Sequence, residues 1–259
     1  MTAGGANQVA KPETRPREAC RGGPGKPLLV CDWERALMIH YAIDPAVLQP
    51  HVPFELDTRD GQAFVSLVAF TMRDMRLRRG GRLTHWLTIP IATHGYLNVR
   101  TYVRVGRERG IQFLTEWMPN KLSLAMAPAT FGLPYRYGHL DFHHRHEEGY
   151  AYGTVTPGDR TAALHYHATF DKDAGFAPPV NGSLAEFLME RYMAFNDAGV
   201  RRKFRVWHPS WPQVPARVRV TDNGLLARSG PWFAKLELIG ANYSPGFRNV
   251  GLGRPEKLE

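Results

Sequence analysis

The chain has 259 residues, of which 43% are hydrophobic and 11% aromatic, and its formal net charge is +9. This length and aromatic content suit one large β-rich domain better than a helical bundle, because aromatic side chains favour half-buried strands. Residues 1–27, 73–82 and 201–205 carry +3, +4 and +4, so the rest of the chain sums to −2. The charge is therefore local, and with no RNA-recognition, zinc-finger or helix-turn-helix motif, nucleic-acid binding is the least favoured class of function.

The two ends of the chain are expected to lie outside the folded domain. Residues 1–27 contain Gly, Pro and charges but no apolar run long enough for a secretory signal or a membrane span, so we expect a disordered leader. Only Cys20 and Cys31 are present, which excludes a disulfide framework and favours a cytoplasmic location. We expect a single domain over residues 28–250 and a flexible tail over 251–259.

The first predicted elements are a strand at 34–43 and a helical turn at 45–49, with Pro45 at its first position. Asp60-Gly61 indicates a tight turn before a strand at 62–70. Residues 97–105 alternate as in a half-buried strand. One face carries Leu97, Val99, Thr101, Val103 and Val105, and the other carries Asn98, Arg100, Tyr102 and Arg104.

Two helices interrupt the later strands. Asn120 is the expected N-cap of the first, and the second opens with the capping box Ser183–Glu186 and continues through Phe195 on an apolar stripe. Arg191 falls on that stripe, so its charge needs a partner. Further strands are expected at 111–117, 138–145, 150–156, 162–170, 203–207, 215–221 and 232–239. The pattern predicts a mainly β (α+β) fold, a closed or cone-shaped antiparallel β-barrel with two or three covering helices.

Histidines alternate along FGLPYRYGHLDFHHRH, residues 131–146. His139 and His143 share one strand face, and a second strand presents His165 and His167, so paired strands would gather imidazoles of the kind that bind zinc or iron. Arg145 on the same face as His143 would repel a divalent cation. A solvated polar face is therefore preferred to a metal site, and no cofactor is expected.

Polar residues at inward-facing positions indicate a small-molecule pocket. Arg100 and Tyr102 share a strand face and Glu116 follows on the next strand, so a barrel with this face inward would hold them in its lumen. Arg100 offers a fork of donors for a carboxylate, although an internal pair with Glu116 explains it equally well. The segment VWHPSWP contains two prolines, which suggests a rigid loop, and its His208 is expected at the mouth of the barrel. No GxSxG nucleophile elbow is present, so serine hydrolysis is not supported.

Five stretches taken together resemble the YqjF-like family, domain of unknown function 2071. They are HYAIDPAVLQPHVPFELDTRDGQAFVSLVAF, LNVRTYV, FGLPYRYG, FLMERY and VWHPSWP. That family in turn resembles the acetoacetate decarboxylase-like superfamily, which implies a β-barrel or cone around a buried pocket. Members of that superfamily form a Schiff base through a lysine in a Gly-aromatic-Pro-Lys-Lys turn.

The corresponding turn here is Gly132 to Arg136, in which Tyr135 and Arg136 stand where the lysines would be. Neither a phenol nor a guanidinium forms an imine. The pocket glutamate of the superfamily is replaced by Tyr96. The chain offers Lys121, Lys172, Lys203 and Lys235 within the fold, and each is more simply a surface residue, so imine chemistry is not expected.

The favoured function is that of a small-molecule pocket protein that binds a small organic acid or carbonyl compound. If it is an enzyme, we expect lyase-like or hydrolase-like chemistry without a Schiff base. Arg100 and Arg136 would hold the carboxylate, Tyr102 and His208 would line the site, and Glu116 and Tyr135 would move protons. A non-catalytic binding or regulatory module is the alternative, and nucleic-acid binding through the arginine clusters is the second alternative. No membrane partner is expected, and a homo-oligomer is compatible with the sequence.

Overall fold

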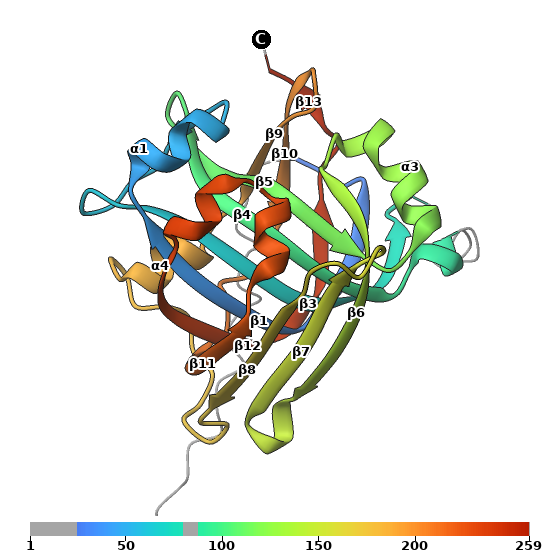
Figure 1. Cartoon of the computed structure of the whole chain (residues 1–259). Helices are drawn as coiled ribbons and strands as arrows, with labels where there is room; N and C mark the ends of the chain where they lie inside the picture. Colours follow the sequence, from blue (N-terminus) through green and yellow to red (C-terminus); the bar gives the residue numbers. More distant parts are fainter. Residues whose placement is uncertain (1–24, 80–87, 259) are drawn as a thin grey trace, which may run out of the picture.

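A computed structural model describes residues 25–79 and 88–258, apart from the side chains of residues 126–130. Within this part of the chain, thirteen strands form one sheet that curls into a ring, with short helices at its margins (Figure 1). The mainly β architecture predicted from the sequence is confirmed.

The strands follow the predicted order, and several are longer than predicted. They are β1 (Leu29–Ile43), β2 (Glu55–Leu56), β3 (Ala63–Leu77), β4 (His94–Val105), β5 (Glu108–Met118), β6 (Tyr135–Arg145), β7 (Tyr150–Pro157), β8 (Leu164–Phe170), β9 (Met193–Asp197), β10 (Arg201–Trp207), β11 (Val214–Asp222), β12 (Glu237–Leu252) and β13 (Glu256–Lys257). The helices are α1 (Pro45–Leu48), α3 (Lys121–Phe131) and α4 (Leu184–Met189), with short 3-10 turns that include η5 (Gly224–Arg228) and η6 (Pro231–Lys235).

The paired strands form two closed rings, and the two rings have five strands in common, which we call the shared wall. The shared wall is the run β12, β1, β3, β4 and β5. One ring returns from β5 to β12 through β9 and β10, and the other returns through β6, β7, β8 and β11. Each strand of the wall therefore presents one face to each of two interiors.

Side-chain alternation divides the core between those two interiors. On β4, Leu97 and Val99 belong to one buried apolar cluster, whereas Tyr96 and Tyr102 belong to the other. We call the first the packed interior and the second, which contains a cavity described below, the cavity interior. The alternation predicted for residues 97–105 is confirmed, and it places Asn98 and Arg100 on the cavity side.

Local signals read from the sequence fix several element boundaries. The Asp44 carboxylate accepts a hydrogen bond from the Ala46 N–H at 2.8 Å and caps α1. The Asn120 side chain caps α3 by accepting from the Ser123 N–H at 2.9 Å. Asp60 and Gly61 both have positive φ, 52° and 77°, as the predicted tight turn requires.

Three sequence-based predictions are wrong. The second helix ends at Met189, and residues predicted to continue it form β9, which pairs with β5 and β10. The predicted strand at 232–239 is replaced in its first half by η6, after which the long strand β12 begins. Residues 256–257 of the expected flexible tail form β13 and pair with β10. For β9 and β13, pairing with a distant strand decided the conformation, and a local pattern does not contain that information.

The two cysteines differ in whether the structure describes them. Cys31 is a buried free thiol, and Cys20 lies outside the described residues, as does most of the leader expected at 1–27. In the part of the chain that the structure describes, no helix has the length and apolar character needed to cross a membrane.

Candidate functional site

A buried cavity of about 110 Å³ lies in the cavity interior. One side of it is aromatic, with Trp33 stacked on Trp211 at 5.8 Å between ring centroids and Phe70 stacked on Tyr96 at 5.6 Å. The volume is well below the range of roughly 300–1,000 Å³ that holds drug-sized ligands. The cavity therefore suits a molecule of only a few heavy atoms.

A polar row crosses three neighbouring strands on the cavity face. Asn98 of β4 is paired with Glu116 of β5, and Glu116 is paired with Tyr135 of β6. Directly paired residues hold their Cβ atoms roughly 4.5–5.5 Å apart, so the three side chains are neighbours. The Oδ1 atom of Asn98 and the Oε2 atom of Glu116 are buried without a hydrogen-bond partner among the described residues.

The turn before β6 delivers Tyr135 to this row. Helix α3 ends at Phe131 because Gly132 adopts a left-handed φ of 65°. The Pro134 carbonyl then accepts from the Glu116 N–H at 3.0 Å and starts the parallel pairing of β6 with β5. The FGLPY turn thus brings Tyr135 beside Glu116.

Burial controls the protonation of these groups. It raises the pKa of Glu116 to about 8, so this carboxyl group exchanges a proton near neutral pH. Burial, reinforced by the charge of Glu116, raises the pKa values of Tyr135 and Tyr96 well above the usual value for a phenol. Both phenols therefore stay protonated and serve as donors. Tyr135 is suited to act as a hydrogen-bond donor or acid and is unsuited to act as a base.

Arg100 lines the same cavity and is only 6% exposed. Its Nη2 atom donates to the Leu188 carbonyl at 3.1 Å, and its Nε atom is buried without a hydrogen-bond partner among the described residues. No ion pair joins Arg100 to a carboxylate in the described part of the chain. The internal pair with Glu116 that the sequence allowed is absent there, so the guanidinium can receive an external anion.

The other predicted site residues divide between the cavity and its surroundings. His208 lines the cavity, but its Nδ1 and Nε2 atoms lie 2.6 Å and 3.3 Å from the carbonyl oxygens of Pro209 and Arg191. Its ring also stacks on Tyr192 at 4.6 Å and on Phe247 at 5.2 Å, so it has little capacity to bind a polar ligand. Tyr102 lies behind the cavity, where its hydroxyl is 2.6 Å from the Ser66 Oγ. Arg136 is exposed and lies over the Trp117 ring, so the structure does not bring it to the cavity. The strand period explains this, since Tyr135 and Arg136 necessarily face opposite sides.

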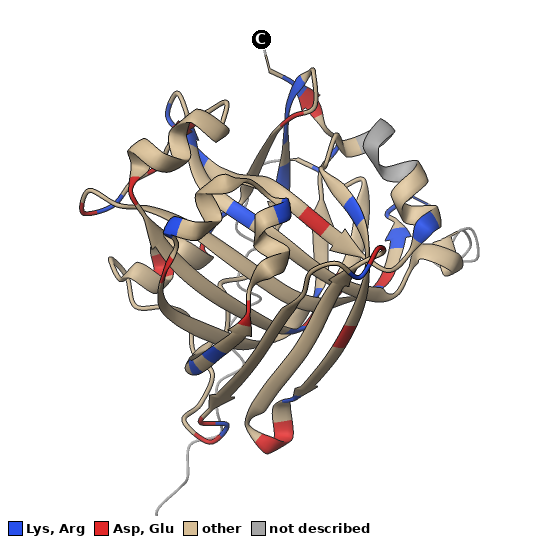
Figure 2. Cartoon of the chain, in the orientation of Figure 1, with Lys and Arg blue, Asp and Glu red and all other residues tan. Residues whose placement is uncertain are grey.

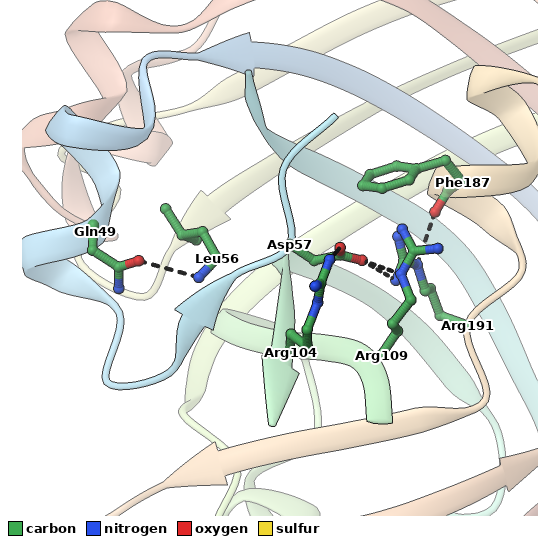
Figure 3. Close-up of polar contacts among 7 residues, drawn as sticks. All are labelled: Gln49, Leu56, Asp57, Arg104, Arg109, Phe187 and Arg191. Atoms are coloured by element: carbon green, nitrogen blue, oxygen red, sulfur yellow. Dashed lines mark hydrogen bonds and ion pairs between the residues drawn. The ribbon is translucent and has the colours of Figure 1, made fainter. Parts of the chain in front are cut away.

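The sequence predicted that the charge of Arg191 needs a partner, and the structure shows that this partner is Asp57. No pattern in the sequence identified Asp57 in advance. The Asp57 carboxylate is fully buried, and it also forms ion pairs with Arg104 and Arg109 (Figure 3). The nitrogen-to-oxygen distances are 2.6 Å for Arg191, 2.7 Å for Arg109 and 3.0 Å for Arg104. Burial alone would raise the pKa of Asp57, but the hydrogen bonds from Arg109 and Arg191 outweigh it and hold the pKa below its usual value.

The alternating histidines form a cross-strand ladder on the outer face of the sheet. His143 of β6 stacks on Tyr152 of β7 at 4.6 Å, and Tyr152 stacks on His167 of β8 at 6.5 Å. His139 and His165 are exposed on the same strands. Within the described ranges, no group of three His, Cys, Asp or Glu residues is arranged to hold a metal ion. The rings stand face to face, which is the geometry of stabilising cross-strand pairs.

Basic residues are interspersed with acidic ones over the molecule (Figure 2). In the first arginine cluster, Arg73 pairs with Glu34 at 2.6 Å, and residues 80–82 lie outside the described part of the chain. In the second, Lys203 pairs with Glu108 and Arg201 with Asp197. Arg73, Arg201 and Lys203 thus take part in local ion pairs, which gives no support to nucleic-acid binding.

The fold and the buried cavity define a protein of the acetoacetate decarboxylase-like fold. Acetoacetate decarboxylase from Legionella pneumophila is 13% identical with a TM-score of 0.62, and the match covers 100% of this chain and 98% of that one. An acetoacetate decarboxylase-like enzyme from Sphingomonas wittichii RW1 is 18% identical with a TM-score of 0.59, covering 98% and 100%. The enduracididine biosynthesis enzyme MppR in complex with pyruvate is 14% identical with a TM-score of 0.62, covering 91% and 92%. At these identities the likeness establishes the fold alone.

The chain belongs to the family DUF2071, described as an uncharacterized conserved protein, whose model matches residues 31–246. It is also similar to the uncharacterized protein YqjF of Bacillus subtilis (strain 168), with 28% identity over 196 residues. That match covers 74% of this chain and 77% of the relative. The family resemblance drawn from five short stretches is confirmed.

Proposed function

We propose that the cavity binds a small organic acid or carbonyl compound and that the protein acts on it without a lysine Schiff base. The observation that carries this proposal is the pairing of two complementary groups in one small space. Arg100 brings a buried positive charge with no carboxylate partner among the described residues, and Glu116 brings a carboxyl group whose burial raises its pKa to about 8. An anion at Arg100 would relieve the cost of a buried unpaired charge.

In this proposal Arg100 anchors the carboxylate, and Glu116 removes or returns a proton next to the carbonyl group. Tyr135 donates a hydrogen bond to the oxygen on which negative charge develops, a role for which its raised pKa keeps it protonated. A carboxyl group with a pKa near the working pH is effective in both directions of proton transfer. That MppR, a protein of the same fold, has been solved with pyruvate supports a ligand of this size.

The absence of lysine around the cavity supports chemistry without an imine. None of the described residues that line the cavity is a lysine. Lys203 is paired with Glu108, Lys172 with Asp173, and Lys121 lies over the Tyr137 ring. Borohydride treatment in the presence of a β-keto acid should therefore label no lysine.

Solvent exchange measured by proton NMR tests the enzymatic proposal. Pyruvate in D₂O should lose its methyl proton signal faster with the protein than without it. Glu116→Gln should abolish that acceleration and retain binding in a thermal-shift assay, whereas Arg100→Met should abolish both. Equal exchange rates for the wild type and Glu116→Gln would overturn the assignment of Glu116.

The alternative, a binding module without catalysis, makes a different prediction in the same experiment. Small acids would raise the melting temperature in an Arg100-dependent way, but no substrate proton would exchange. If none of the tested acids raised the melting temperature, that result would contradict both the enzymatic and the non-catalytic form of the proposal.

A further inference from the structure

An open groove of about 650 Å³ adjoins the cavity. Its walls come from α4 and the segment after it, and from strands β5, β9 and β10. They include Phe187, Glu108, Arg109, Met193 and Arg205. Arg191 lines both the groove and the cavity, so the two spaces meet at this residue.

The charges at this junction are unbalanced. Three guanidinium groups, those of Arg104, Arg109 and Arg191, converge on the single carboxylate of Asp57 (Figure 3). Asp57 is fully buried, whereas the side chains of Arg104 and Arg109 are 44% and 50% exposed. Arg109 lines the groove and Arg104 does not, so the exposed positive charge that Arg109 carries lies in the groove wall.

Three glutamates also line the groove, but each is engaged elsewhere. Glu108 pairs with Lys203 at 2.7 Å and approaches Arg205 at 3.6 Å. Glu186 accepts from the Gly182 N–H, and Glu190 accepts from the Trp211 N–H and the Tyr192 hydroxyl. None of them forms an ion pair with the three arginines around Asp57 in the described part of the chain.

Arg191 has a donor left over. Its Nη1 atom bonds Asp57 and its Nε atom bonds the Phe187 carbonyl at 2.8 Å, but its buried Nη2 atom has no hydrogen-bond partner among the described residues. Arg109 uses Nε for Asp57 and lies over the Phe187 ring at 5.0 Å. Because a guanidinium carries five N–H donors, both side chains can still bind an oxyanion.

We infer that this groove is an anion subsite, which holds a carboxylate or phosphate group of an extended substrate whose small acid end occupies the cavity. This inference rests on the proposed function, because it assigns the cavity to the acid end. The two volumes, about 110 Å³ and about 650 Å³, suit a small reacting group joined to a larger anionic remainder. Arg109 and Arg191 would bind that remainder where it leaves the cavity.

Binding of straight-chain acids to the full-length protein tests the subsite. Calorimetry should compare α,ω-dicarboxylates of increasing length with monocarboxylates of the same carbon number. Above the length that spans the junction, the dicarboxylate should bind about tenfold more tightly, as one added charge-assisted hydrogen bond implies. An ω-phosphonocarboxylate series then distinguishes a phosphate from a carboxylate preference.

Arg109→Gln should remove this tenfold gain and leave monocarboxylate binding unchanged. Asp57 keeps Arg104 and Arg191 in that variant, so the fold should persist. Arg107→Gln is the matched control, because it makes the same charge change at an exposed position that does not line the groove. Equal affinities of the two acid series at every length, or a gain that survives Arg109→Gln, would overturn the inference.

The same data separate this inference from the proposed function. Loss of monocarboxylate binding in Arg100→Met supports the assignment of the cavity as the acid site and does not bear on the groove. A wild type that binds long dicarboxylates through Arg109 but binds no short acid would keep the groove as an anion site and reject the cavity as the acid site.

Discussion

The two interiors on either side of the shared wall are built by the same strands but hold different contents. On β3, Leu67 and Val65 enter the packed interior, where leucines, valines and tyrosines from β7, β8 and β12 surround them. Val68 and Phe70, on the other face of the same strand, enter the cavity interior together with Arg100 and Glu116. Strand alternation thus lets one sequence segment serve stability and ligand binding at the same time.

The difference shows where this fold tolerates polar groups. In the cavity interior the buried polar atoms without partners among the described residues include those of the amide Asn98 and the ionisable groups Glu116 and Arg100. In the packed interior they belong to the aromatic side chains Tyr41, Trp117 and Tyr243. Each such atom costs free energy of folding, and burying an ionisable group costs most. The packed interior supplies the apolar burial that offsets this cost. Five substitutions, grouped into four tests, examine this division.

Asp57→Asn should have the largest effect, a loss of about 3–5 kcal/mol in the free energy of unfolding. The substitution leaves Arg191, which is 4% exposed, without its buried counter-charge. Chemical denaturation measures the loss, and Asp60→Asn, at a side chain that is 90% exposed, is the control with little effect. Since the folded pKa of Asp57 is lowered, its contribution is present above the unfolded pKa and is lost as the pH falls through the folded pKa. Equal stability of the two variants would contradict this account.

Val65→Ala and Val68→Ala make the same chemical change on the two faces of β3. Val65 is fully buried in the packed interior, so we expect a loss of about 2 kcal/mol from removed contacts and the new cavity. Val68 lines an existing cavity, so its truncation removes fewer contacts and should cost about 1 kcal/mol. Urea unfolding of both variants measures the difference. An equal or larger loss for Val68→Ala would contradict the looser packing of the cavity interior.

Glu116→Gln should change how stability depends on pH. Burial raises the folded pKa of Glu116 to about 8, so its contribution is fully present below the unfolded pKa and is lost as the pH rises through about 8. The Glu116 contribution to stability should therefore fall between about pH 4.5 and pH 8, by at most about 1.4 kcal/mol per pH unit. Burial lowers the pKa values of His40 and His144, which act in the opposite direction, so the difference in stability between the wild type and Glu116→Gln isolates the Glu116 contribution.

The glutamine variant should lack this decline, which denaturation at several pH values measures. Glu237→Gln, at an exposed position on β12, should retain it. A stability difference between the wild type and Glu116→Gln that stays level over that range would show that the pKa of Glu116 is not raised.

Tyr152→Ala should have the smallest effect, a loss of about 0.2–1 kcal/mol. Tyr152 is 40% exposed and stacks between His143 and His167 on the outer face, where cross-strand pairs contribute modestly. Thermal unfolding measures it, and binding of small acids should not change. A loss of ligand binding would show that the histidine ladder takes part in the site.

Local sequence patterns were sufficient to predict the features of the structure that depend on neighbouring residues along the chain. The alternation of residues 97–105, the helical turn that begins at Pro45, the cap at Asn120 and the turn at Asp60-Gly61 are all found in the structure. Strand alternation on β4 identified Arg100 as a candidate site residue, and the FGLPY turn identified Tyr135. Both residues line the cavity. The helix predicted to continue through Phe195 shows the limit of local patterns. That segment is the strand β9, because it pairs with β5 and β10.

The sequence by itself determined the mainly β class, the family and the absence of a lysine from the FGLPYR turn, because these depend on periodicity and residue identity. Only the tertiary structure decided which polar groups meet. Asn98, Glu116 and Tyr135 are neighbours through strand register, and Asp57 reaches Arg191 across 134 positions of the chain. Register and long-range charge pairing arise from the packing of the whole sheet, whereas a one-dimensional pattern records only which face each side chain takes.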